Sequence, residues 1–287
     1  MMQPEEQSAI YLGPRDETFK ALITSLLERG KIKPKYIESL VTPENMKIYG
    51  QAFTAESADK ETNYEIFEQL GDVSANKFLV WYFYRRFPQL ECPLGVKVVA
   101  RLRINYGAKQ SFAKIGESLG FWPFISATEA ERSQKKKSLL EDCLESFVGC
   151  TEQLLDKQYR PGVGYAIVYD ILASVFDQYP ISLEYNDLYD PKTRLKELFD
   201  VKEYKKTLGS WTFVDSRDED AQLAESYLYQ IPPGFTAANK DKLRQIGVGR
   251  AAKKPDAQQK AAKEGLKTLQ SWGFVKKIPE EYKLFCK

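Results

Sequence analysis

Residues 63–72 read NYEIFEQLGD and place three acidic side chains within ten residues. Glu65, Glu68 and Asp72 are spaced i, i+3 and i+7, so in a helix they lie on one stripe. Two carboxylates about 4 Å apart near a protein surface repel each other by roughly 4 kcal/mol at an effective dielectric constant of about 20. The stripe leads into the apolar run FLVWYFY at 78–84, which is expected to be buried. Carboxylates crowded beside such a segment either have raised pKa values or share a cation.

The predicted counter-charge for this stripe is a divalent metal ion. The chain contains no histidine, and no Lys or Arg lies between residues 61 and 76. A hard cation with oxygen ligands is then the simplest partner for the carboxylates. Mg²⁺ is the expected cofactor, and Mn²⁺ is the alternative ion.

A second acidic pair occurs in LLEDCLESFVGC, residues 139–150. Asp142 and Glu145 are spaced i and i+3, beside apolar residues that mark a core-facing helix surface. Taken alone, such a pair most often lies on a solvated helix face. By itself it therefore predicts no function.

Composition and charge bound the class of protein. The chain has 287 residues, which is more than a single hydrophobic core usually supports. Its composition is that of an ordinary globular protein, with 43% hydrophobic and 29% charged residues. Residues 240–287 contain 13 Lys or Arg and 5 Asp or Glu, so the C-terminal end is basic. This asymmetry predicts either a polyanion-binding end or a solvated, lysine-rich helix face.

The cysteine and histidine counts exclude several kinds of site. The four cysteines show no CxxC spacing, and without histidine a zinc site or a Ser-His or Cys-His catalytic pair is not expected. The thiols suit a reducing compartment. The N-terminal sequence has neither a signal-peptide nor a transit pattern, and no apolar run is long enough to span a membrane. We therefore expect a soluble cytoplasmic or otherwise intracellular protein with no membrane partner.

Apolar periodicity predicts an all-helical first part of the chain. No strand alternation is evident before residue 205, and a tyrosine-rich break follows at 179–191. The expected helices span residues 17–29, 63–87, 108–119, 137–157 and 163–178.

The C-terminal part predicts a compact α-β-β-β-α module. DPKTRLKELFD, residues 190–200, begins a helix with Asp190 as the cap and Pro191 in the first turn. The expected strands and final helix span residues 211–215, 224–231, 242–250 and 255–272.

These segments resemble the ribonuclease III family in four places. NYEIFEQLGDVSANKFLVWYFYRRFP is similar to the family signature N-E-R-L-E-F-L-G-D-S-V-L, which ends in Arg-Arg-Phe-Pro, and LLEDCLESFVG resembles its second acidic helix. DPKTRLKELFD and GVGRAAKKPDAQQKAAKEGL resemble the opening and closing segments of a double-stranded-RNA-binding domain. The likeness covers residues 17–272 in family order.

The resemblance implies a fold and domain organisation. It implies an all-α RNase III endonuclease domain followed by an α+β (α-β-β-β-α) dsRNA-binding domain. The expected division is an N-terminal extension 1–16, an endonuclease domain 17–182, a linker 183–189, an RNA-binding domain 190–273 and a basic tail 274–287.

The resemblance also assigns roles to the acidic residues. It implies that Glu68, Asp72, Asp142 and Glu145 gather around Mg²⁺, with Glu65 as an accessory position. We expect Glu145 as a central ligand and Asp72 as the residue that binds or orients the attacking water, so these two are the catalytic candidates. The implied reaction is hydrolysis of double-stranded RNA by metal-activated water.

The candidate RNA contacts lie in the C-terminal module. Lys253 and Lys254 precede the last helix, where phosphates would meet both lysines and the helix N-terminus. Arg250, Lys260 and Lys196, the last at a position where the family has Gln, are further candidates.

Some positions depart from the family pattern. Gln69 stands where the family has an apolar residue that docks into a partner subunit, which weakens the expectation of a homodimer without removing it. The loop 216–222 is acidic where the family pattern is Gly-Pro-x-His, so RNA binding is expected to be weaker or differently posed.

Three functions therefore remain open from the sequence. They are an active endonuclease, a non-catalytic RNA-binding or ribosome- and RNA-processing scaffold, and a nuclease that acts through a partner chain.

Overall fold

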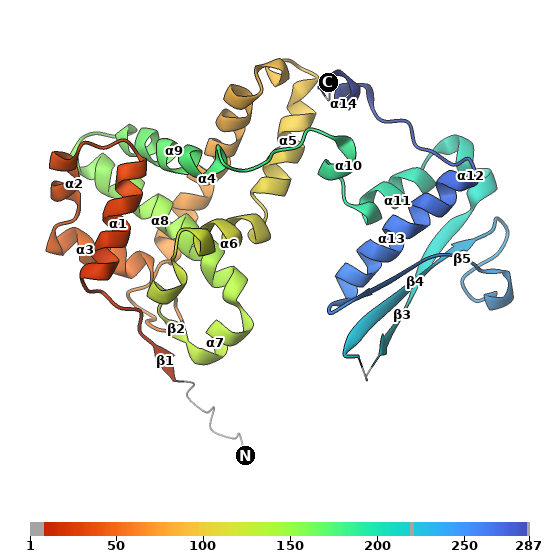
Figure 1. Cartoon of the computed structure of the whole chain (residues 1–287), viewed down its shortest axis with the longest axis horizontal. Coiled ribbons are helices and arrows are strands. Elements are labelled where there is room, and N and C mark those ends of the chain that lie inside the picture. Colours follow the sequence, from red (N-terminus) through yellow and green to blue (C-terminus); the bar gives the residue numbers. More distant parts are fainter. Residues whose placement is uncertain (1–8, 219–220, 286–287) are drawn as a thin grey trace. The chain divides into compact units, whose positions relative to one another are not determined.

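The computed structural model describes residues 9–218 and 221–285 of the chain. It divides the chain into two compact units, Met1–Ile181 and Ser182–Lys287 (Figure 1). Among the described residues, no helix is both long enough and apolar enough to cross a membrane. Three expected segments lie partly outside the described residues: the extension 1–16, the acidic loop 216–222 and the tail 274–287.

The first unit is built mainly from helices. Each of the five helices expected from periodicity is confirmed, with bounds that differ by at most two residues. The elements in chain order are β1 (Ile10–Tyr11), α1 (Glu17–Arg29), α2 (Pro34–Leu40), α3 (Pro43–Ala52), α4 (Glu65–Arg86), η1 (Pro88–Leu90), α5 (Gly95–Tyr106), α6 (Lys109–Ser118), η2 (Trp122–Phe124), β2 (Ala127–Thr128), α7 (Glu129–Gln134), α8 (Lys136–Gln158) and α9 (Val163–Phe176).

The expectation of a purely helical first unit needs one correction. Strands β1 and β2 pair antiparallel, with Ile10 opposite Thr128 and Tyr11 opposite Ala127. Arg15 holds this region to α3, because its guanidinium donates to the backbone oxygens of Phe53 and Gly50 at 3.1 and 3.2 Å. A two-residue strand is too short to show alternation in the sequence.

Helix α8 is the central helix of the first unit. Its residues from Cys143 to Thr151 are buried without interruption, so the helix is covered on all sides at this level. It packs against α3, α4, α6 and α9. The adjoining helix α4 buries Phe67, Phe78 and Phe83 and leaves another side of its surface exposed.

The second unit contains a three-stranded antiparallel sheet in the order β3-β4-β5. The predicted cap is confirmed, since the Asp190 side chain accepts a hydrogen bond from the Thr193 backbone nitrogen at 3.0 Å. The elements are α10 (Tyr185–Leu188), α11 (Pro191–Phe199), α12 (Lys202–Leu208), β3 (Ser210–Asp218), β4 (Leu223–Ile231), η3 (Lys240–Lys242), β5 (Arg244–Ala251), α13 (Lys254–Ser271) and α14 (Glu280–Phe285).

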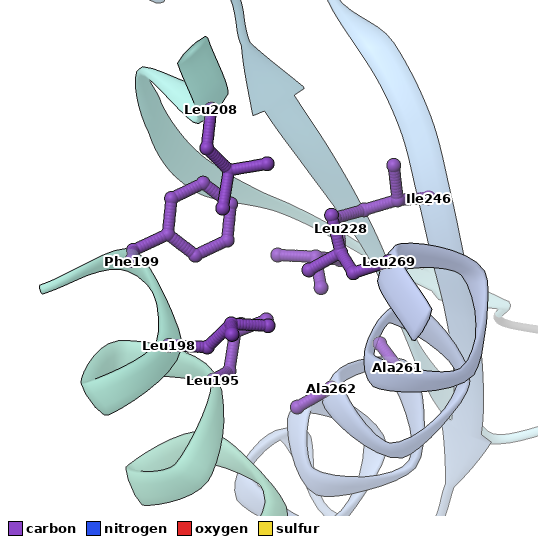
Figure 2. Close-up of a cluster of buried hydrophobic side chains, with 9 residues drawn as sticks. All are labelled: Leu195, Leu198, Phe199, Leu208, Leu228, Ile246, Ala261, Ala262 and Leu269. Carbon is purple, nitrogen blue, oxygen red and sulfur yellow. The ribbon is translucent and has the colours of Figure 1, made fainter. Parts of the chain in front are cut away.

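Helices α11 and α13 enclose an apolar core against the sheet (Figure 2). Gly249 in β5 allows the close approach of α13, because a Cβ atom there would lie 2.1 Å from the backbone oxygen of Ala257. The core residues are Leu195, Leu198, Phe199, Leu208, Leu228, Ile246, Ala261, Ala262 and Leu269. This order of helix, three strands and helix is the one expected from sequence, with α10 and α12 as additional short helices.

Candidate metal centre

Helices α4 and α8 pack so closely that their contact requires glycine. A Cβ atom on Gly71 would lie 1.7 Å from the backbone oxygen of Glu145, and one on Gly149 would lie 2.2 Å from that of Phe67. A side chain at either position would clash with the backbone of the other helix. The two glycines therefore allow the helix axes to lie at this short separation. The contact brings the acidic stripe of α4 beside α8.

Three carboxylates converge at this contact. Glu68, Asp142 and Glu145 each offer one oxygen, and these oxygens lie within 4.8 Å of one another. Glu145 is 7% exposed, whereas Glu68 and Asp142 are half-buried. The group faces an open cavity of about 860 Å³, which is lined by Glu65, Ile66, Glu68, Gln69, Asp72, Val73, Lys109, Glu141, Asp142 and Glu145.

Asp72 lines the same cavity but lies outside the group of three converging oxygens. Its carboxylate accepts a hydrogen bond from Nδ2 of Asn76 at 2.7 Å, and Oδ1 of Asn76 accepts one from Nη1 of Arg103 at 3.0 Å. Glu65 is exposed on the cavity wall. The structure thus brings together three of the four predicted ligands and places Asp72 beside them, with its orientation set by Asn76.

Burial and mutual repulsion oppose ionisation of the cluster. Burial, followed by the charges of Asp72 and Glu141, raises the pKa of Glu145 to about 8. Burial and the Asp142 charge raise the pKa of Glu68 to about 7. Burial also raises the pKa of Asp142 to about 6, against a lowering by its hydrogen bond with Tyr64. The crowding expected from the spacing of the stripe is therefore present between the two helices.

Tyr64 is a positioning residue that the sequence analysis did not identify. Its hydroxyl donates to Oδ2 of Asp142 at 3.1 Å, across a separation of 78 residues in the chain. Ser146 ties the same turn of α8 to α4, because its hydroxyl donates to the backbone oxygens of Asp142 at 2.7 Å and of Tyr64 at 3.4 Å. These contacts fix the Asp142 carboxylate toward the cavity.

Lys109 is the one cation among the described residues that line the cavity. Its Nζ atom pairs with Oε2 of Glu141 at 2.6 Å, and the ion pair involves none of Glu68, Asp142 or Glu145. The lysine charge nevertheless lowers the pKa of Glu68 and of Asp142 against the stronger effect of burial. Lys109 was not identified from sequence, because it lies 37 residues after Asp72 and 33 residues before Asp142. Glu141 was not identified either, although it directly precedes Asp142 on α8.

The donor set fits a hard divalent cation. Glu68, Asp142 and Glu145 supply carboxylate oxygens alone, the ligand type that Mg²⁺ and Mn²⁺ take in proteins. A cation among these oxygens would relieve the repulsion that raises their pKa values. Lys109 does not take that place, since its ammonium group is bound by Glu141.

The predicted RNA contacts lie on the surface of the second unit. Lys253, Lys254, Arg250 and Lys260 are all exposed. Lys253 is the N-cap residue of α13 and Lys254 its first residue, at the end of the helix where backbone N–H groups are free to bind an anion. Lys196, on α11, is also exposed.

Some of these cations already have partners within the unit. Nζ of Lys254 pairs with Asp215 at 2.9 Å, and Nε of Arg250 pairs with Glu225 at 2.5 Å. Lys260 donates to the backbone oxygen of Arg250 at 2.8 Å. Both acidic partners come from the sheet, where sequence reasoning assigned no role.

The relatives of the chain decide its family. A protein of Invertebrate iridescent virus 6 that bears a ribonuclease 3 name is 42% identical over 293 residues, which cover 98% of this chain and 97% of that protein. The chain belongs to the ribonuclease III family. The model of the Ribonuclease III domain matches residues 65–152, a span that contains α4, most of α8 and the entire cluster. As a member of the ribonuclease III family, the chain is an endoribonuclease.

A second viral protein and one solved structure are also similar to the chain. A Frog virus 3 protein with a ribonuclease 3 name is 39% identical over 87% of this chain, and the chain spans 62% of that longer relative. The nuclease domain of ribonuclease III from Campylobacter jejuni is a solved structure that is 25% identical, covers 52% of this chain and 99% of that chain, and has a TM-score of 0.41.

Proposed function

We propose that the chain is a Mg²⁺-dependent endoribonuclease that hydrolyses double-stranded RNA. The observation that carries the proposal is the convergence of Glu68, Asp142 and Glu145 on one open cavity within a ribonuclease III domain. The three carboxylates are buried or half-buried and lie so close together that their charged forms are destabilised. A non-catalytic scaffold would have no need of such an arrangement.

Glu68, Asp142 and Glu145 are the proposed cation ligands. Bound Mg²⁺ would supply Lewis acidity, lowering the pKa of water and neutralising charge on the phosphodiester. Glu145 is fixed by its burial in α8, and Asp142 is fixed by its hydrogen bond from Tyr64. These two side chains therefore present their oxygens with little conformational freedom, which limits the entropy lost on binding a cation.

Asp72 and Lys109 have distinct proposed roles on the cavity wall. The Asp72 carboxylate is exposed and oriented by Asn76, so it accepts a proton or a hydrogen bond from a water molecule beside the scissile phosphate. Lys109 places an ammonium group at the cavity, where it offsets the negative charge of the cluster toward an approaching phosphate. No nucleophile from the protein is needed for this reaction.

Within the second unit, residues 190–273 are proposed to bind the RNA duplex, and residues 17–182 are proposed as the endonuclease domain. Lys253 and Lys254 combine two exposed charges with the N-terminus of an 18-residue helix, an arrangement that suits a phosphate backbone. Recognition of this type reads the A-form shape across the minor groove and not the base sequence. The segment 183–189, expected as a linker, contains α10, so it has its own structure within the second unit.

A homodimer is proposed through the outer face of α4. This face carries exposed apolar side chains, with the exposed Lys77 between Val73 and Trp81, and Gln69 replaces the apolar residue of the family pattern. Such a stripe on a helix is a common protein interface, and a second copy would place two cutting sites on one duplex. The exposed fractions are Ile66 57%, Leu70 45%, Val73 66% and Trp81 54%.

Cleavage of labelled duplex RNA tests the proposed function. We expect the chain with Mg²⁺ to yield products, and Glu145→Gln to slow cleavage at least about 100-fold because several kcal/mol of charge stabilisation depends on the bound cation. Glu117→Gln is the matched control, since Glu117 is an exposed residue that pairs with Lys136 outside the cavity. Binding of duplex RNA without cleavage by the unaltered chain would instead support a scaffold.

A further inference from the structure

A second cavity lies in the C-terminal unit, beside its apolar core. Its volume is about 240 Å³, whereas small-molecule sites usually have volumes of roughly 300–1,000 Å³. The cavity is formed by α10, α11, the C-terminal half of α13 and the segment that follows α13. Its lining residues are Tyr185, Asn186, Arg194, Leu198, Lys263, Leu266, Lys267, Gln270, Phe274, Val275 and Lys276.

The charged residues of this cavity are all cations. Arg194 comes from α11, Lys263 and Lys267 lie one turn apart on α13, and Lys276 follows the helix. No Asp or Glu belongs to the lining among residues 9–218 and 221–285. Lys276 is neutralised by Glu197, whose carboxylate lies 2.6 Å from its Nζ atom.

Lys263 and Lys267 are the cations available to a ligand. Both are exposed, and neither has an ion pair or hydrogen bond with another described residue through its side chain. Two such ammonium groups four residues apart on a helix repel each other. An anion held between them would remove this repulsion.

One wall of the cavity is apolar. Leu198 extends from α11 toward α13 (Figure 2), and Leu266 and Phe274 line the same space. The amide of Gln270 adds a hydrogen-bonding group beside this wall, and the amide oxygen of Asn186 accepts a hydrogen bond from Nη1 of Arg194. The cavity therefore joins a cationic rim to an apolar surface that includes one aromatic ring.

We propose that this cavity binds a phosphate monoester attached to a small planar group, such as a nucleoside monophosphate. A phosphate monoester carries a charge of about −1.5 to −2 at pH 7 and three acceptor oxygens, which matches several converging cations better than a single carboxylate does. Lys263 and Lys267 hold the phosphate with Arg194, and the planar group lies against Leu266 and Phe274.

This site is separate from the candidate duplex contacts. Lys263 lies ten residues after Lys253 on the same helix, a distance of about 15 Å along the axis. The proposal uses none of the residues assigned to the nuclease centre, so it holds whether or not the chain cleaves RNA.

Calorimetric titration of the full chain with adenosine 5′-monophosphate, adenosine and inorganic phosphate tests the proposal. We expect the monophosphate to bind at least tenfold more tightly than adenosine and more tightly than inorganic phosphate. The double variant Lys263→Ala/Lys267→Ala is expected to weaken monophosphate binding at least tenfold. Lys253→Ala/Lys254→Ala is the matched control on the same helix and is expected to leave this affinity unchanged.

The source of the phosphate is resolved by adding duplex RNA with and without a 5′-phosphate as competitors. Displacement of the monophosphate only by the phosphorylated duplex identifies an RNA end as the source, and displacement by neither identifies a free nucleotide. Equal affinities for adenosine and its monophosphate, no binding at 10 mM, or equal losses in the two double variants would overturn the proposal. Circular dichroism of each variant checks that the unit remains folded.

Discussion

Glu145 lies where the carboxylates of α4 and α8 meet, and it is the most buried member of the cluster. Its charged form is opposed by burial and by the neighbouring Asp72, Glu141 and Glu68. The folded chain without a cation therefore holds a proton at Glu145 more tightly than the unfolded chain does. Linkage then makes the free energy of unfolding depend on pH.

The pH dependence has a defined direction. Because the pKa of Glu145 rises from 4.5 to about 8 on folding, its contribution to stability is full below about pH 4.5 and is lost as the pH rises toward 8. Thermal unfolding in EDTA should show a melting temperature that falls across this interval more steeply in the unaltered chain than in Glu145→Gln. Mg²⁺ at pH 8 should restore the loss. Identical pH profiles for the chain and the variant would contradict this account.

At the scale of single residues, the sequence predicted the identity of the cluster better than its geometry. The spacing of Glu68 and Asp72 on α4 indicated one stripe, but Asp72 is turned to Asn76 and does not join the three converging oxygens. Tyr64 and Lys109 reach the site from positions that no local pattern connects to it. Such contacts depend on how helices pack, which a single sequence does not specify residue by residue.

At the scale of elements, the contact between α4 and α8 determines whether the cluster exists. Gly71 and Gly149 allow the two backbones to meet, and each faces a backbone oxygen of the other helix. The helices themselves were predictable because their apolar spacing extends over many turns. Short elements such as α2, α10 and α12 were not predicted, since seven residues or fewer give too little periodicity.

Gly71→Ala tests the role of this helix contact. The added methyl group would lie 1.7 Å from the Glu145 backbone oxygen, so the helices must separate. We expect the variant to lose about 1–3 kcal/mol of stability from overpacking and to bind divalent cations more weakly. Chemical denaturation and Mn²⁺ titration measure the two effects.

Gly50→Ala is the control for this prediction. A Cβ atom at Gly50 would lie 3.2 Å from the side chain of Arg15 and would meet no backbone atom. Unchanged stability and cation affinity in Gly71→Ala would refute the requirement for glycine.

At the scale of the whole molecule, the chain joins a helical nuclease unit to an α+β unit with a basic surface. The two units are divided between Ile181 and Ser182, and the second unit has an apolar core of its own. Each unit offers one part of the proposed function, since carboxylates gather in the first and exposed lysines begin α13 in the second.

The oligomeric state is predicted at this scale from the exposed face of α4. Val73→Asp places a charge on an apolar residue that is 66% exposed, and it should weaken dimerisation at least about tenfold. Sedimentation equilibrium measures the effect. Val96→Asp is the control, since Val96 is 53% exposed in the first turn of α5, where an acidic residue is favourable. A monomer at all concentrations before substitution would exclude the proposed dimer.

The central claim is that Glu68, Asp142 and Glu145 hold one divalent cation, and anomalous diffraction from crystals grown with Mn²⁺ tests it most directly. We predict an anomalous peak bonded to oxygens of all three residues at distances of about 2.0–2.6 Å. The peak should be absent in Glu145→Gln crystals grown in the same way. A cluster without a peak, or a cation bound only elsewhere on the chain, would contradict the account.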